Sequence, residues 1–320
     1  MTSRKFWFEF TWNAGILIIT MSDELQAVII GEVLFDLFED GQAVLGGAPL
    51  NVAWHLQGFG LSPLLISRVG EDRYGEQITE TMQKWGMDLS GLQIDPVHST
   101  GLVKVKLDNG QAAFEICDDA AYDYIDLAQT DLALTKISSP FLYYGSLAAR
   151  HHQVYDTIQQ LRQAASQSFV DINLRPPWWD MQKLTRLMQG VNYLKVNDDE
   201  LCRLTGVSDD LSAMADATKD LIQQYQIDTV IVTRGDQGAL VVTADNIIQS
   251  PPVRVHNMQD TVGAGDAFSA ISMLGVMQEW EPALVFARAT EFAARICEQR
   301  GATNFDLAMY DNFRTQWQLT

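Results

Sequence analysis

The chain has 320 residues, of which 47% are hydrophobic and 20% charged, a composition typical of a globular protein with a sizeable core. Its formal net charge of -19 argues against nucleic-acid binding, because no run of Lys or Arg offsets the repulsion of a phosphate backbone. The three cysteines, Cys117, Cys202 and Cys297, form no disulfide or metal-binding pattern. They predict reduced thiols in a cytoplasmic protein.

The first twenty residues loosely mimic a signal peptide, since a basic pair precedes an apolar stretch from Phe6 to Ile19. Glu9 and Asn13 interrupt this stretch, and no small-x-small cleavage site follows it. We therefore expect residues 1–20 to be an appendage outside the fold, with no association with a membrane. Residues 21–320 are then expected to form one domain.

Apolar runs of strand length alternate with amphipathic stretches of helix length along this domain. The expected strands are 27–33, 63–69, 140–145, 168–173, 192–196, 228–234 and 239–244. The expected helices are 49–58, 72–85, 151–165, 181–189, 198–205, 212–225, 265–278 and 282–298. This alternation predicts a three-layer α/β fold, in which helices flank both faces of a mainly parallel sheet.

Residues 100–118 break this rhythm, because apolar and polar side chains alternate on either side of an Asp-Asn-Gly turn at 108–110. Strands with one polar face, set within an α/β chain, predict a small β-sheet that projects from the main body as a lid. We expect the lid segments near 33–45 and 97–120. An apolar face on this sheet would also suit a homodimer contact.

A glycine-rich segment precedes an apolar helix near the C-terminus. Gly263, Ala264 and Gly265 would leave backbone N–H groups uncovered at the helix N-terminus, which favours anion binding. Asp266, in the first turn, has two interpretations: a helix cap, or a general base beside a transferring phosphoryl group. The flanking glycines favour the base, because a phosphate needs close approach and a cap does not.

Two familiar nucleotide-binding patterns are missing. The chain lacks the P-loop pattern that ends in Gly-Lys-Ser/Thr, so a kinase of this type must hold phosphate with backbone donors and other cations. It also lacks an N-terminal Gly-x-Gly-x-x-Gly, which disfavours a nicotinamide-dependent oxidoreductase. A non-catalytic sugar or nucleotide sensor would be expected to carry a damaged Gly-Ala-Gly-Asp, and here this sequence is intact.

A second glycine-rich segment begins with Gly46 and Gly47, ahead of a predicted helix whose Pro49 suits the first helical turn. Asn51 lies on a different face of this helix from the core-facing side chains. Its amide offers a donor and an acceptor to a sugar hydroxyl, and the alternative is a turn with a solvated Asn.

Together, the two glycine-rich segments resemble the signature motifs of the PfkB, or ribokinase-like, family of carbohydrate kinases, from about 27 to 317. The resemblance implies a ribokinase-like fold and ATP-dependent phosphorylation of a sugar hydroxyl. It also implies that Asp266 is the catalytic base, and that the N–H groups of Gly263, Ala264 and Gly265 form an anion hole for the transferring phosphate.

The same resemblance implies nucleotide and metal sites. The segment 197–200 resembles a motif that organises magnesium and phosphate, with Glu200 acting on Mg²⁺ through water; an acidic helix start is the alternative. Asp260 and Val262 match a place where many members hold K⁺. The implied nucleotide-binding residues are Asn197, Thr233, Gly235, Gly238, Gly263, Gly265 and Asn304. For the segment 233–238, a plain β-turn is the alternative.

The implied substrate-binding residues are Asp36, Gly46, Gly47, Asn51, Arg175 and Asp266. The segment 171–179 resembles a motif of the fructokinase and ketodeoxygluconate kinase branch, in which the arginine faces the substrate or the transferring phosphate. This implies a role for Arg175 in catalysis, and a structural Asp–Arg pair is the alternative. The expected reaction is therefore fructose to fructose 6-phosphate. Another sugar or a sugar acid, such as 2-keto-3-deoxygluconate, is the alternative substrate.

Overall fold

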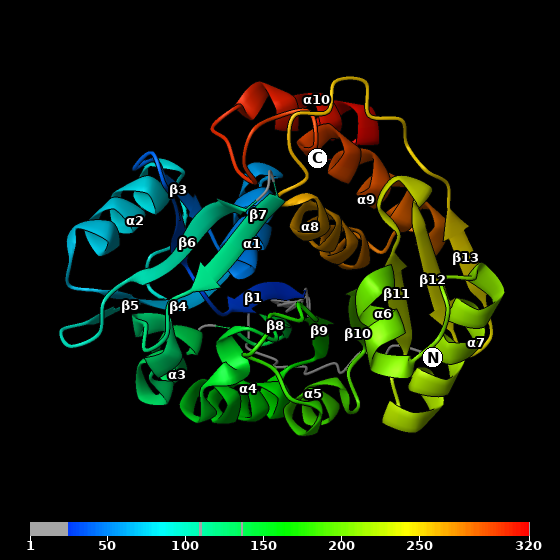
Figure 1. Cartoon of the computed structure of the whole chain (residues 1–320), viewed down its shortest axis with the longest axis horizontal. Coiled ribbons are helices and arrows are strands. Elements are labelled where there is room, and N and C mark those ends of the chain that lie inside the picture. Colours follow the sequence, from blue (N-terminus) through cyan, green and yellow to red (C-terminus); the bar gives the residue numbers. More distant parts are fainter. Residues whose placement is uncertain (1–24, 109–110, 136, 320) are drawn as a thin grey trace, which may run out of the picture.

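The computed structural model describes residues 25–108, 111–135 and 137–319, so the expected appendage at 1–20 lies outside the described residues. A nine-stranded sheet crosses the molecule in the order β13-β12-β11-β10-β9-β8-β1-β4-β5 (Figure 1). Its neighbouring strands are parallel except where β12 pairs with β11 and β13. The prediction of a mainly parallel sheet is therefore confirmed.

The strands of this sheet are β1 (Gln26–Ile30), β4 (Leu64–Gly70), β5 (Leu92–Asp95), β8 (Pro140–Gly145), β9 (Gln167–Asp171), β10 (Tyr193–Asn197), β11 (Thr229–Thr233), β12 (Ala239–Thr243) and β13 (Ile247–Ser250). All the strands predicted for it are present. The sequence did not reveal β5 and β13, because each has only four residues and no long apolar run.

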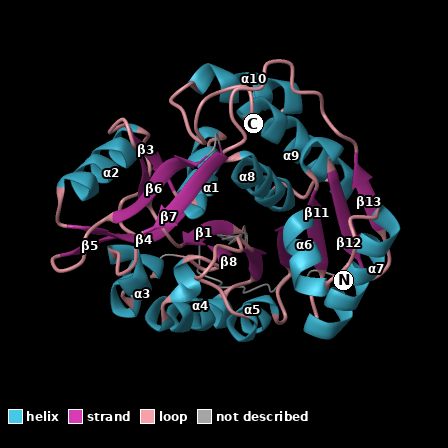
Figure 2. Ribbon diagram, viewed as in Figure 1, coloured by secondary structure: helices cyan, strands magenta, loops and turns pink. Residues whose placement is uncertain are grey.

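Helices cover both faces of the sheet (Figure 2). One hydrophobic core contains buried side chains of α1 (Ala48–Gly58), α2 (Arg73–Lys84), α8 (Ala264–Met277), α9 (Pro282–Ile296) and α10 (Leu307–Trp317). The other contains those of α4 (His152–Ala164), α5 (Met181–Met188), α6 (Asp198–Thr205) and α7 (Leu211–Tyr225). α3 (Leu127–Leu134) packs on this second core, and it and α10 were not predicted.

Strand β1 shows why the central strands read as unbroken apolar runs. Ala27 and Ile29 belong to one core, whereas Val28 and Ile30 belong to the other. Successive side chains point to opposite faces of a strand, so a strand covered on both faces is apolar at most of its positions. This burial fixes the register of the strands whose carboxyl ends meet at one edge of the sheet.

A separate four-stranded sheet has the order β3-β2-β6-β7, with β2 (Leu34–Phe38), β3 (Ala43–Gly46), β6 (Gly101–Asp108) and β7 (Gln111–Ile116). The antiparallel pair of β6 and β7 confirms the two strands of the predicted hairpin, whereas Asn109 and Gly110 of its predicted turn lie outside the described residues. Strand β2 follows soon after the end of β1, so the small sheet continues from the carboxyl edge of the large one (Figure 1).

Within the described ranges, no helix combines the length and apolarity needed to cross a membrane. Cys117, Cys202 and Cys297 are free thiols in the structure.

The close contact between α1 and α10 gives a first prediction. A Cβ added at Gly58 would lie 2.5 Å from a ring carbon of the fully buried Tyr310. We therefore expect Gly58→Ala to lower the free energy of unfolding by about 1–3 kcal/mol, measured by urea denaturation. Gly145→Ala is the control, because its Cβ would meet only the Asp171 carbonyl oxygen, at 3.8 Å. Equal losses in both variants would contradict this explanation.

Candidate active site

A cavity of about 690 Å³ lies between the carboxyl edge of the large sheet and the small sheet, within the size range of small-molecule sites. In open α/β sheets, ligands bind beyond the carboxyl ends of the strands, as here. The small sheet contributes Leu34, Asp36, Val44, Leu45, Gly46, Val103 and Ile116 to the cavity wall. The expected lid segments therefore contain strands that border the cavity.

Helix α8 begins at the cavity wall. Its N-cap, Gly263, has φ 81°, and a Cβ there would lie 2.3 Å from the Cβ of Ala302, so only glycine fits. The helix start has no side-chain cap hydrogen bond, although the N–H of Ala264 donates to the Thr261 carbonyl at 3.3 Å. Gly263, Ala264 and Gly265 all line the cavity. An uncapped helix N-terminus facing a cavity favours an anion.

Asp266 does not cap this helix. Its Oδ2 instead accepts a hydrogen bond of 2.7 Å from Nδ2 of Asn51, in α1. Burial raises the pKa of Asp266 above its usual range, and the nearby charge of Asp171 adds to this shift, whereas Asn51, Lys195 and Arg175 oppose it. The structure therefore disfavours the cap interpretation and leaves a carboxylate at the cavity wall that a nearby amide orients.

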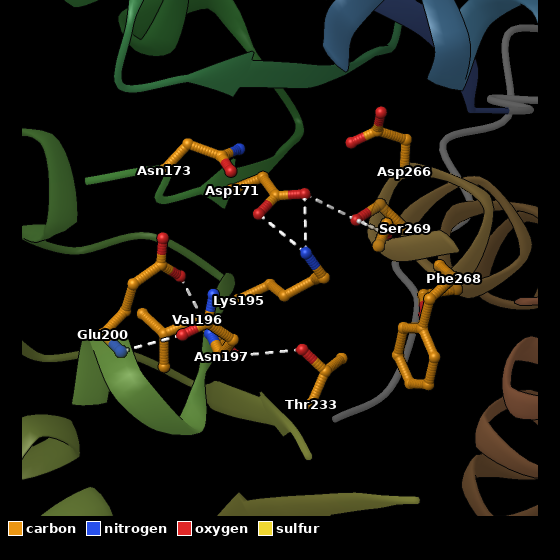
Figure 3. Close-up of polar contacts among 12 residues, drawn as sticks. Asp171, Asn173, Lys195, Val196, Asn197, Glu200, Thr233, Asp266, Phe268 and Ser269 are labelled. Carbon is orange, nitrogen blue, oxygen red and sulfur yellow. Dashed lines mark hydrogen bonds and ion pairs between the residues drawn. The ribbon is translucent and has the colours of Figure 1, made fainter. Parts of the chain in front are cut away.

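A buried ion pair lies beneath the start of α8 (Figure 3). Nζ of Lys195, in the middle of β10, lies 2.8 and 2.9 Å from the two carboxylate oxygens of Asp171, at the end of β9. The hydroxyl groups of Ser269 and Tyr143 donate to the same carboxylate, at 2.7 and 3.2 Å. Burial lowers the pKa of Lys195, but the Asp171 charge outweighs this and raises it above its ordinary value. Lys195 is thus held as a cation.

The Lys195 ammonium group also adjoins the predicted anion site. A Cβ at Gly265 would lie only 3.3 Å from Nζ of Lys195, and Lys195 lines the cavity. Lys195 and Asp171 were not predicted individually as site residues. The sequence nevertheless contained evidence for Lys195, because a lysine within an otherwise apolar strand that is buried on both faces needs a charged or polar partner.

Asn197 and Glu200 form a capping box at the start of α6. Oδ1 of Asn197 accepts from the N–H of Glu200 at 2.8 Å, and Oε2 of Glu200 accepts from the N–H of Asn197 at 2.9 Å. Oε1 of Glu200 accepts from the N–H of Leu174 at 3.0 Å. These contacts agree with the alternative interpretation, in which the segment 197–200 is an acidic helix start. Both side chains also line the cavity.

Most of the predicted site residues come together around this one cavity. The residues predicted to bind the substrate that line it are Asp36, Gly46, Gly47, Asn51, Arg175 and Asp266. The residues predicted to bind the nucleotide that line it are Asn197, Thr233, Gly235, Gly238, Gly263 and Gly265. Burial raises the pKa of Asp36 to about 6, and the Arg175 charge opposes this shift.

Two predicted residues are not at the cavity wall. The carbonyl of Asn304 accepts from the indole N–H of Trp54 at 2.8 Å, and its amide donates to Gln299. The Asp260 carboxylate accepts from the N–H groups of Val262 and Gly301, at 3.1 and 3.2 Å. Asn304 therefore contacts α1 through its main chain, and the Asp260 side chain connects two segments of the chain. Only Val262 of the proposed potassium pair lines the cavity.

Comparison with known proteins identifies relatives across almost the whole chain. A family model described as pfkB family carbohydrate kinase matches residues 25–308. A putative sugar kinase of Pyrococcus horikoshii is 26% identical over 268 residues, covering 78% of this chain and 82% of that protein. A fructokinase of Salmonella typhimurium is 28% identical over 256 residues, covering 76% of this chain and 81% of that protein.

Solved structures agree with this result. The fructokinase of Vibrio cholerae O395, bound to fructose, ADP and calcium, has a TM-score of 0.73 and 25% identity, covering 91% of this chain and 99% of that one. The structure of the Pyrococcus horikoshii sugar kinase with ATP has a TM-score of 0.72 and 25% identity, covering 87% of this chain and 94% of that one.

The buried pair gives a second prediction. Lys195→Met should lower the free energy of unfolding by about 3–5 kcal/mol, because it leaves the Asp171 charge buried without its cation. Asp171→Asn in the same chain removes that charge, so the double variant should recover most of the loss. Urea denaturation of both variants measures the difference. A double variant no more stable than Lys195→Met would show that the uncompensated charge is not the cause.

Proposed function

The chain belongs to the pfkB family of carbohydrate kinases, and we propose that it transfers the terminal phosphoryl group of ATP to fructose, forming fructose 6-phosphate. As a member of this family it is a phosphotransferase that acts on a sugar hydroxyl. The observation that carries the proposal is the hydrogen bond from Asn51 to Asp266, which joins the sugar-side helix to a carboxylate beside an uncapped helix N-terminus. Fructokinases among its relatives support fructose as the acceptor.

In this proposal, Asp266 removes the proton from the attacking sugar hydroxyl. Its pKa is raised by burial, which brings it closer to neutral pH and strengthens it as a base. The Asn51 amide fixes one carboxylate oxygen at 2.7 Å and leaves the other for the hydroxyl. Positioning of this kind supplies much of the catalysis in phosphoryl transfer.

Charge on the transferring phosphoryl group needs stabilisation from donors already in place. We assign this role to the N–H groups of the segment 263–265, together with the guanidinium of Arg175. Arg175 is exposed at the cavity wall, where its forked donors suit a phosphoryl oxygen. The Lys195 ammonium beneath Gly265 adds positive charge on the same side.

The nucleotide is proposed to occupy the other end of the cavity, against Asn197, Thr233, Gly235 and Gly238. ATP bound to the Pyrococcus horikoshii kinase supports its use as the phosphoryl donor. Asn304 remains a predicted nucleotide contact of this group, although its polar atoms bond to other segments of the chain here.

The residues near the proposed phosphate site suit Mg²⁺ held through water. The described residues contain no group of three His, Cys, Asp or Glu side chains arranged to hold a metal directly. Each oxygen of Glu200 accepts one backbone N–H and keeps a lone pair for a water molecule. Because Mg²⁺ retains several waters and binds substrate phosphates, this arrangement fits it. Bound there, Mg²⁺ would neutralise phosphate charge. Potassium at Asp260 and Val262 stays a prediction.

The small sheet is proposed to act as a lid, since it provides one wall of the cavity. Closing that wall would exclude water and so limit wasteful ATP hydrolysis. A homodimer through the same sheet stays a prediction.

The charges at the sugar side favour a neutral acceptor. Three carboxyl groups line it, those of Glu32, Asp36 and Asp266, against the single guanidinium of Arg175. They would repel the carboxylate of a sugar acid. The Arg175 guanidinium favours 2-keto-3-deoxygluconate instead, since it could pair with that carboxylate.

The base assignment gives a third prediction. Asp266→Asn should cut kcat by at least about 100-fold, because the amide cannot accept the proton. The variant should still fold and bind fructose, as measured by thermal unfolding and titration calorimetry. Asp245→Asn, at an exposed turn between β12 and β13, is the matched control and should keep full turnover. Near-normal turnover of Asp266→Asn would rule out the assignment.

The substrate assignment gives a fourth prediction. In a coupled assay with ATP, kcat/KM for fructose should exceed that for 2-keto-3-deoxygluconate by at least about tenfold. The panel should also contain ribose, glucose and adenosine. A preference for the sugar acid that disappears in Arg175→Gln would overturn the fructose assignment and support the alternative. A ribose- or adenosine-only profile would also overturn it.

A further inference from the structure

Glu32 is a buried carboxyl group at the junction of the two sheets, and the roles assigned above do not include it. It lies between the end of β1 and the start of β2, and it is only 4% exposed. It lines the same cavity as Asp266. Its Oε2 atom is buried and has no hydrogen-bond partner. Buried polar atoms almost always have partners, so an unpaired oxygen at a cavity wall needs a separate explanation.

No neighbouring cation explains the unpaired oxygen of Glu32. Burial raises the pKa of Glu32 to about 7, and Asp266 adds to the shift, while the backbone N–H groups of Glu32 and Ala148 and the Arg150 charge oppose it. The Arg150 guanidinium, however, donates to both oxygens of Asp123, at 2.7 and 2.6 Å, and to the Cys117 carbonyl at 2.8 Å. Among the described residues Glu32 forms no ion pair, so Oε2 is free to meet a ligand.

A second unpaired atom lies in the same wall. Nδ2 of Asn51 donates to Asp266, but Oδ1 of Asn51 is buried without a partner. Oδ1 can only accept, and therefore it requires a donor from the ligand. The cavity wall that holds Asp266 therefore contains two oxygens without hydrogen-bond partners. A polyhydroxyl ligand could pair one hydroxyl with each of them.

The backbone around Glu32 is held rigidly against α1. A Cβ at Gly47 would lie 2.5 Å from the Glu32 carbonyl oxygen, and a Cβ at Gly31 would lie 2.4 Å from Cγ of Pro49. Both glycines thus allow close contact between the end of β1 and the start of α1. Since α1 also carries Asn51, the two orphaned oxygens are held in a fixed relation, as a specific site requires.

We propose that Glu32 is a substrate-binding and specificity-determining residue, whose Oε2 forms a hydrogen bond with a sugar hydroxyl other than the one that is phosphorylated. The proposal rests on the sugar-kinase function given above. A hydroxyl both donates and accepts, so it pairs with Glu32 in either protonation state. A substrate carboxylate would pair only with the protonated form and would be repelled by Asp36 and Asp266.

A cycle of enzyme and substrate variants tests this contact. Steady-state kinetics would compare wild type, Glu32→Ala and Glu32→Met with fructose and with deoxyfructoses that each lack one hydroxyl. For Glu32→Ala, KM for fructose should rise about 10- to 100-fold, the range for losing a hydrogen bond to a charged group. KM for ATP should change less than about twofold. Glu80→Gln, at an exposed position of α2, is the matched control and should match wild type.

The deoxy analogues supply the decisive comparison. One analogue should lose kcat/KM strongly with wild type but little further with Glu32→Ala, because both changes remove the same hydrogen bond. If every analogue loses the same factor with both enzymes, Glu32 does not contact the sugar. If Glu32→Ala fails to fold, Glu32→Met, which keeps the length of the side chain but has no oxygen to pair with a hydroxyl, carries the same comparison. Absence of fructose turnover in wild type would instead contradict the proposed substrate, and the cycle would then use the sugar found in the panel.

Discussion

The hydrogen bond from Asn51 to Asp266 is the contact on which the rest of the site depends. It joins α1, which follows the first strands, to α8, which lies more than two hundred residues later. Each helix begins with glycines that permit close backbone contact, and each begins at the cavity wall. The two glycine-rich segments therefore border one cavity only because both helices pack on the same face of the sheet.

Charge is distributed unevenly around this contact. The chain carries a net charge of -19, yet the proposed phosphate site has the uncapped start of α8, the exposed guanidinium of Arg175 and the buried Lys195 on one side. Asp171 keeps Lys195 charged and oriented. An acidic protein can thus receive an anionic ligand, because local donors within a low-dielectric wall act more strongly than distant surface charge.

Several active-site features were predicted because they are local in sequence. Glycine pairs, helix starts and the Gly-Ala-Gly-Asp segment each lie within a few residues, and the hairpin was revealed by its alternation around one turn. Asp171, Lys195 and Glu32 were not identified individually. The importance of each depends on residues of other elements. Ser269 forms a hydrogen bond with Asp171, Gly265 lies close to the Lys195 ammonium, and Glu32 shares a cavity wall with Asp266.

By itself, the sequence determined the layered α/β fold, the positions of the long strands and the family, because apolar periodicity and glycine motifs depend on neighbouring residues. Only the tertiary structure decided that Asp266 bonds to Asn51 instead of capping its helix. It also placed the main-chain carbonyl of Asn304 against the indole N–H of Trp54, in α1. The physical reason is that burial and hydrogen-bond partners arise when distant segments pack, and no local pattern records them.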